Sequence, residues 1–226
     1  MDSGSAFKKG RVIAFSLGTL AWLSVVLQCC LSVQLALHNG RSIGDGLATF
    51  FSYFTVLANL LVCLSLTASL IGTSSAFGRW FSRPAVIAGI ATSIAFVGLS
   101  YHFLLRNIWS PQGAQLVADC LLHYVLPALY VLYWWFACSK AGLRWLHPLF
   151  WSLYPTAYLV YALVRGSMVG SYPYPFIDAA KLGYGQTMLN SFGLLLAFIA
   201  LGMVFVALGR RAHVAAGSEM KRNVHT

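Results

Sequence analysis

The stretch AVIAGIATSIAFVGLSYHFLL occupies residues 85–105 and contains no Asp, Glu, Lys or Arg. A helix of about 20 residues, rising about 1.5 Å per residue, is long enough to cross the hydrocarbon core of a bilayer. The stretch is continuously apolar, whereas the strands of a membrane barrel alternate in character over segments of about ten residues. We therefore predict a transmembrane α-helix here.

Similar apolar segments recur on both sides of this one along the whole chain of 226 residues. Only 9% of the residues are charged, compared with about a quarter in ordinary globular domains, so a water-soluble surface is not expected. The sequence predicts an all-α, polytopic membrane bundle of six transmembrane helices, and these are Val12–Leu37, Leu47–Ile71, Ala85–Leu105, Leu116–Cys138, Pro148–Val164 and Tyr184–Leu208. One domain covers residues 1–209, and we expect residues 210–226 to form a disordered, polar cytoplasmic tail.

The distribution of basic residues predicts the orientation of the bundle. If the N-terminus is cytoplasmic, eleven basic residues lie inside: Lys8, Lys9, Arg11, Arg79, Arg83, Lys140, Arg144, Arg210, Arg211, Lys221 and Arg222. Four lie outside: Arg41, Arg106, Arg165 and Lys181. By the positive-inside rule both termini are cytoplasmic. The net charge of +10 does not indicate a nucleic-acid partner, because the cations sit at helix ends and tails rather than in a basic stripe.

Polar residues within the predicted spans concentrate in the outer leaflet. Thr55 is expected about 12 Å below the outer end of its span and His123 about 11 Å below the outer end of its own, so the two are level. Asp119 lies one turn above His123, and Asn59 lies one turn below Thr55. Other polar residues at this level are His102, Arg106, Tyr158, Arg165 and Asn190. Intramembrane polar groups usually face the bundle interior, which predicts a cavity open toward the outer face.

The pairing of Thr55 with His123 suggests nucleophilic chemistry. A threonine hydroxyl needs a neighbouring base to take its proton, His123 is of that type, and Asp119 could orient the imidazole. Asn59 or Asn190 could assist an oxyanion, and Arg106 or Arg165 could hold a substrate carboxylate, with His102 and Tyr158 also among the substrate-binding candidates. The alternatives are a threonine bonded to its own helix and a histidine that only bridges helices.

A metal or cofactor is not predicted. His102, His123 and Asp119 are of suitable ligand types, but their spacing is not a known metal signature. The five cysteines all fall in apolar segments without a C-x-x-C pair, so neither disulfides nor a thiolate site is expected.

The segment from Arg165 to Gly183 is the longest connection. Pro173 and Pro175 forbid a regular helix there, and the alternation of Tyr with Pro favours an extended aromatic segment at headgroup level. Such a segment could cover the outer ends of the helices as a lid.

Three motifs resemble the androgen-induced gene 1 protein family and its six-helix bacterial relatives over nearly the whole chain. They are YFTVLANLL at residues 53–61, LLHYVLPALY at residues 121–130 and YPYPFID at residues 172–178. The resemblance implies an intramembrane hydrolase of fatty-acid esters of hydroxy fatty acids, with Thr55 as nucleophile and His123 as its base.

Our leading hypothesis is accordingly a lipid-ester hydrolase of a bacterial inner membrane, with membrane lipids and a small amphiphilic ester as its partners. A protein that binds or transports a small amphiphile through the same cavity is the main alternative, although no internal repeat of the kind common in transporters is visible. A purely structural subunit, in which the polar cluster only joins helices, is the third.

Overall fold

The computed structural model describes the backbone of residues 3–224 and the side chains of residues 10–215. This part of the chain is helical and contains no strand, which confirms the all-α prediction. The α-helices are α1 (Ser3–His38), α2 (Ile43–Phe50), α3 (Phe54–Ile71), α4 (Ala76–Phe81), α5 (Pro84–Ser100), α6 (Gly113–Cys120), α7 (Leu126–Ala137), α8 (His147–Trp151), α9 (Leu153–Val169) and α10 (Ala179–Val224). Three short segments of other helix types are the π-helices η1 (Tyr101–Leu105) and η2 (Leu121–Val125) and the 3₁₀-helix η3 (Pro175–Ile177).

Five helical stretches of the described residues are long and apolar enough to cross a membrane. They are Gly10–His38, Phe54–Ile71, Pro84–Leu105, Gly113–Ala137 and Ala179–Ala215. The remaining predicted span, Pro148–Val164, differs from the prediction because it falls on two helices, α8 and α9, that meet at Ser152. Since α9 has 17 residues, it is short for a full crossing of about 20.

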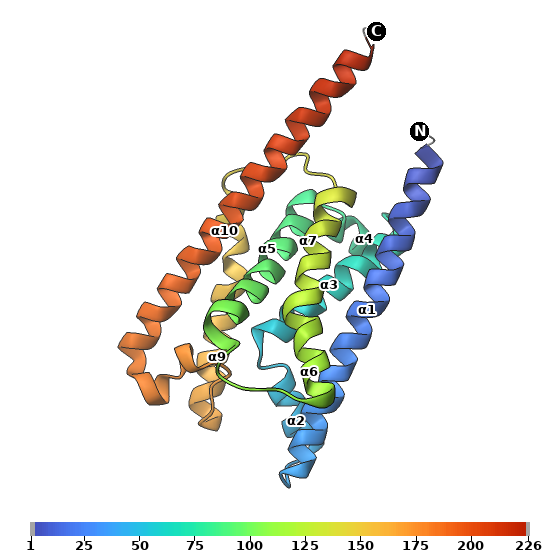
Figure 1. Cartoon of the computed structure of the whole chain (residues 1–226). Helices are drawn as coiled ribbons and strands as arrows, with labels where there is room; N and C mark the ends of the chain where they lie inside the picture. Colours follow the sequence, from blue (N-terminus) through green and yellow to red (C-terminus); the bar gives the residue numbers. More distant parts are fainter. Residues whose placement is uncertain (1–2, 225–226) are drawn as a thin grey trace.

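The described chain begins and ends on one side of the bundle. Figure 1 shows the start of α1 and the end of α10 on that side. Between the end of α7 and the start of α10 the chain returns to the opposite side through α8 and α9.

The predicted span Leu47–Ile71 is interrupted near its N-terminal end. Helix α2 stops at Phe50 and α3 begins at Phe54, with Tyr53 in extended conformation as its N-cap. Helix α2 begins with a capping box in which Ser42 and Asp45 bond each other's backbone amides. The consequence is that Thr55 lies in the first turn of a helix, not in the middle of one as predicted.

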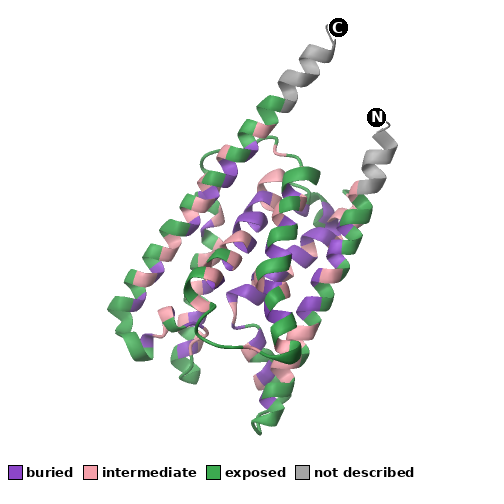
Figure 2. Ribbon diagram, in the orientation of Figure 1, coloured by how far each residue is buried: buried purple, intermediate pink, exposed green. Residues whose placement is uncertain are grey.

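Small residues allow helices to pack closely against one another. A Cβ added to Gly46 would lie 2.7 Å from the Val33 backbone, and one added to Gly98 would lie 3.0 Å from the carbonyl oxygen of His123. Such close backbone approach is typical of membrane helices, where packing rather than the hydrophobic effect drives association. Buried residues gather between the helices and exposed apolar residues face outward (Figure 2), as expected of a bundle surrounded by lipid.

Helix α10 differs from the prediction at both of its ends. Its first turns precede a break at Gly183, whose φ of 73° interrupts the helix just before the predicted start at Tyr184. At the other end the helix continues beyond Leu208 to Val224, so the tail predicted to be disordered from Arg210 is helical there. Its content of Ala, Met, Lys and Glu is favourable to a helix even without packing.

Candidate functional site: an intramembrane threonine and histidine

Thr55 lies in the first turn of α3, where backbone N–H groups have no partner within the helix. The residue four positions earlier, Phe51, lies outside α3, so the Thr55 hydroxyl does not bond back to its own helix. The N-terminal end of a helix also favours negative charge through the helix dipole. A buried hydroxyl at this position is therefore well placed for an anionic state.

His123 lies in the middle of η2, a π-helical turn between α6 and α7. Pro127 follows four residues later and has no N–H to donate to the His123 carbonyl, which removes one α-helical hydrogen bond from this turn. Single π-turns within α-helices occur frequently at functional sites. The turn places the imidazole toward α3.

The Thr55 hydroxyl oxygen lies 3.3 Å from Nε2 of His123. The other ring nitrogen, Nδ1, lies 3.0 Å from the carbonyl oxygen of Asp119 and 3.2 Å from its carboxylate Oδ1. Because both neighbours of Nδ1 are oxygen acceptors, we assign the ring proton of the neutral imidazole to Nδ1. The lone pair of Nε2 can then accept the proton of the Thr55 hydroxyl. The pair that the depth argument placed at one level is thus in contact.

A tyrosine completes this chain of polar contacts. The Tyr101 hydroxyl donates to Oδ2 of Asp119 at 2.5 Å, and the Tyr101 ring stacks on the imidazole with centroids 3.9 Å apart. Tyr101 belongs to η1, so each of the two π-helical turns contributes a side chain to the site. Asp119 is 4% exposed, and the bond from Tyr101 supplies a partner for its buried Oδ2.

The loop between α9 and α10 reaches into the bundle and brings a second tyrosine to Thr55. The Tyr174 hydroxyl oxygen lies 3.4 Å from the Thr55 Oγ1 and accepts from the Thr55 N–H at 3.3 Å. Burial raises the pKa of Tyr174 to about 12, so its phenol stays protonated and able to donate. The loop was predicted as an extended aromatic segment at headgroup level, and within it Tyr174 is buried against the helices.

The two asparagines predicted as oxyanion donors are engaged elsewhere. Nδ2 of Asn59 donates to the Thr55 carbonyl at 2.8 Å and to the Leu122 carbonyl at 3.3 Å, which ties α3 to η2. Nδ2 of Asn190 donates to the carbonyl of Phe176 at 3.0 Å and holds the loop against α10. Both amides fix the framework around the Thr55–His123 pair rather than pointing at the hydroxyl.

The remaining predicted residues are spread around the site. Tyr158 is buried and donates to the Ser52 carbonyl at 2.9 Å, which fixes the break before α3. Nε2 of His102 lies 3.2 Å from a guanidinium nitrogen of Arg106 at the exposed end of η1. Arg165 donates to the backbone carbonyl of Ser171 in the loop. Within the described residues no group of three His, Cys, Asp or Glu side chains is arranged to hold a metal.

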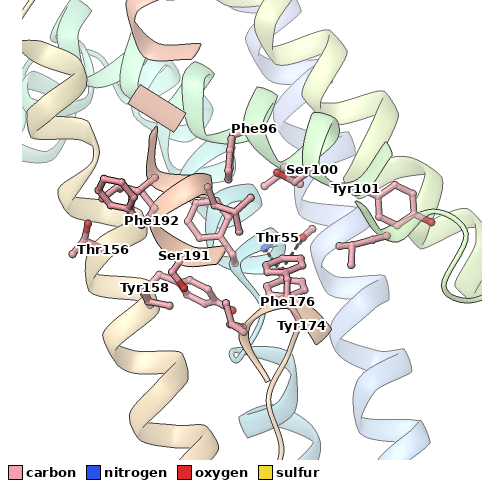
Figure 3. Close-up of a pocket in the computed structure, with 18 of the residues that line it drawn as sticks. Thr55, Phe96, Ser100, Tyr101, Thr156, Tyr158, Tyr174, Phe176, Ser191 and Phe192 are labelled. Atoms are coloured by element: carbon pink, nitrogen blue, oxygen red, sulfur yellow. Dashed lines mark hydrogen bonds between the residues drawn. The ribbon is translucent and has the colours of Figure 1, made fainter. Parts of the chain in front are cut away.

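Two cavities adjoin Thr55. The first has a volume of about 400 Å³ and lies between α5, α9, α10 and the loop (Figure 3). The second, of about 380 Å³, lies on the side of α1, α2 and α6 and includes His123 and Asp119 in its lining. These volumes are in the range of small-molecule sites, and a largely apolar lining with few polar groups is typical of them.

Sequence reasoning missed Tyr101 and Tyr174 as site residues. Tyr101 precedes the candidate His102 directly, but depth alone does not show which of two neighbours faces the interior. For Tyr174 the signal was present in the Tyr–Pro alternation, although it indicates only an irregular aromatic segment and not its path.

We compared the chain with protein-family models, curated proteins and solved structures. No family model, no curated protein and no solved structure matches the chain. The chain is an apolar helical bundle with the character of an integral membrane protein, and its function has to be argued from the site itself.

Proposed function

We propose that this protein is an intramembrane hydrolase of lipid esters that uses Thr55 as its nucleophile. The observation that carries the proposal is the distance of 3.3 Å between the Thr55 hydroxyl and Nε2 of a histidine whose Nδ1 faces Asp119. A nucleophile, a base and a group that orients the base, within hydrogen-bond reach of one another, are the arrangement that acyl transfer requires. Large adjoining cavities supply room for a lipid.

In the proposed reaction the Thr55 oxygen attacks the ester carbonyl carbon while His123 takes the hydroxyl proton on Nε2. The imidazolium is stabilised by Asp119, and the tetrahedral oxyanion is stabilised by donors beside the hydroxyl. The nearest of these are the Thr55 N–H, at the positive end of α3, and the Tyr174 phenol. Collapse expels the alcohol, and water then hydrolyses the acyl-threonine with the same histidine as base.

The membrane setting of the proposal is a six-crossing bundle with both termini in the cytoplasm of a bacterial cell. The chain begins α1 and ends α10 on one side of the bundle, and this common side together with the excess of basic residues predicted there supports the orientation. It would place the site in the outer half of the inner membrane. We also propose kinship with the androgen-induced gene 1 protein family, for which the three motifs are the support.

The test is turnover and covalent labelling of the purified chain in detergent. A fluorophosphonate probe and a branched lipid ester should both react, and Thr55→Ala and His123→Ala should each abolish the reaction. Thr156→Ala is the matched control, because Thr156 lines the same apolar cavity but its hydroxyl donates to the carbonyl of Ser152. Reaction that persists in Thr55→Ala would exclude this mechanism, and lipid binding without turnover in the wild type would favour the amphiphile-binding alternative.

A further inference from the structure

The two cavities beside Thr55 differ in chemical character although they share part of their lining. Four residues belong to both: Thr55, Tyr101, Leu105 and Tyr174. Beyond these, the larger cavity is walled mainly by aliphatic and aromatic side chains of α5, α9, α10 and the loop. The other cavity carries several uncharged polar side chains, namely Gln28, Ser32, Thr49 and Gln115. Most of the lining of both cavities is apolar, but the second is the more polar of the two, and we call it the polar cavity.

The base lies on the polar side only. His123 and Asp119 line the polar cavity and are not part of the apolar one. Ester cleavage needs the departing alcohol oxygen to receive the proton held on Nε2, so this oxygen must lie near His123. The alcohol half of the ester then occupies the polar cavity, and the acyl chain extends from the carbonyl carbon into the apolar cavity.

The polar cavity is suited to a neutral alcohol and not to an anionic one. Its described lining contains no Lys or Arg, while the buried carboxylate of Asp119 belongs to it. The arginines expected to hold a carboxylate, Arg106 and Arg165, line neither cavity. A substrate carboxylate in this cavity would lie near the Asp119 carboxylate with no cation in the lining, and like charges at short range repel each other.

Amide and hydroxyl groups in this cavity match the hydrogen-bonding pattern of a polyol. Gln115 of α6 donates to Oε1 of Gln28 at 3.1 Å, and Gln28 of α1 donates to Ser32 at 3.3 Å. This chain of neutral donors and acceptors joins α1 to α6 at the wall of the cavity. Each of these groups retains capacity for a further hydrogen bond to a ligand hydroxyl.

Resting on the proposed hydrolase function, we infer that the substrates are acyl esters of an uncharged polyol, of the monoacylglycerol type, rather than esters of hydroxy fatty acids. The glycerol part contacts Gln28 and Gln115, and the acyl chain lies among α5, α9 and α10. The Thr55 oxygen forms a bond to the acyl carbon, the bond from this carbon to the glycerol oxygen breaks, and the Thr55 proton passes through Nε2 of His123 to that oxygen. Water then releases the fatty acid and restores the threonine hydroxyl.

The experiment compares two esters of one acyl group with the full-length protein in detergent. Monooleoylglycerol and the oleoyl ester of hydroxystearic acid are supplied at equal concentration, and released oleate is measured. We expect the glycerol ester to react at least tenfold faster in kcat/KM. Gln115→Arg places a cation in the polar cavity and should reverse the preference by raising turnover of the anionic ester. Gln186→Arg is the matched control, because Gln186 is exposed on α10 and lines neither cavity.

The outcomes separate this inference from the function on which it rests. Thr55-dependent turnover that favours the anionic ester in the wild type overturns the polyol assignment and leaves the hydrolase standing. Equal turnover of both esters, unchanged by Gln115→Arg, also overturns the assignment. If neither ester nor the fluorophosphonate reacts, both proposals fail together.

Discussion

The hydroxyl oxygen of Tyr174 lies 3.4 Å from that of Thr55, although 119 residues separate the two in the chain. The contact exists because the segment after α9 turns back into the bundle, and its aromatic rings stack there, Tyr174 against Phe176 with centroids 5.2 Å apart. The loop is thus part of the wall around the nucleophile (Figure 3).

Tyr174→Phe removes a donor beside the hydroxyl while keeping the ring. If the phenol stabilises the oxyanion, kcat should fall about 10²-fold, the usual effect of losing one such donor, with little change in KM. The measurement is steady-state hydrolysis in detergent. Tyr161→Phe, on the exposed side of α9, is the control and should leave kcat unchanged. An unaltered kcat in Tyr174→Phe would show that the phenol only packs.

Asp119→Asn tests the orientation of the base. The substitution keeps an acceptor for Tyr101 but removes the negative charge that stabilises the imidazolium, so kcat should fall about 10²- to 10⁴-fold. Tyr101→Phe alone should cost less because the charge remains. Since both residues act through one carboxylate, the double variant should resemble Asp119→Asn rather than the product of the two effects. The pH profile of kcat should shift in Asp119→Asn, and a profile identical to the wild type would contradict this role.

Leu195→Trp tests where the acyl chain lies. Leu195 lines the apolar cavity, and the larger ring would occupy part of its volume of about 400 Å³. We expect the preferred acyl chain to become shorter, as measured by kcat/KM over a series of saturated esters. The neighbouring Leu196 is exposed and lines neither cavity, so Leu196→Trp should preserve the wild-type preference. A parallel shift in both variants would place the chain elsewhere.

Gly98→Ala tests the close approach between α5 and the π-turn of His123. The added Cβ would lie 3.0 Å from the His123 carbonyl oxygen and 3.3 Å from Cβ of Pro127, so the two helices would have to separate. Overpacking of this kind costs about 1–3 kcal/mol, which should lower the unfolding temperature in detergent and reduce turnover. Gly193→Ala, with nothing within 4 Å of the added Cβ, should leave the unfolding temperature unchanged or raise it. Equal stability of the two variants would contradict the packing argument.

The helical bundle could be predicted because length and continuous apolarity are sufficient to recognise a membrane-crossing helix. The break between Phe50 and Phe54 could not be predicted, since the sequence FFSYF contains neither Gly nor Pro and Ser52 is the one small polar residue in it. The break is fixed by tertiary contacts, among them the hydrogen bond from Tyr158 to the Ser52 carbonyl.

That Thr55 and His123 lie at the same depth in the bundle could be predicted, because the rise per residue fixes how far a side chain lies from the end of its helix. The directions of the side chains could not, because they depend on the π-turns at Tyr101–Leu105 and Leu121–Val125. Asn59 lies at the depth that a role beside Thr55 would need. Its amide, however, donates to backbone carbonyls of α3 and η2 and not to the Thr55 hydroxyl. Tyr174 lies on a loop, and a loop sequence has no periodic hydrophobic pattern that would predict its path.

The π-turn at Leu121–Val125 holds one residue more than the α-turn that it replaces. Loss of one residue there would let the span close as an unbroken α-helix, and the segments before and after the turn would stay nearly in register, because an α-turn covers almost the same angle and length with one residue fewer. The residues inside the turn, His123 among them, would face other directions. Insertion into the bilayer would hardly change, because the apolar length would be almost the same. A descendant of this chain could therefore lose its chemistry through a single codon and remain a well-inserted membrane protein.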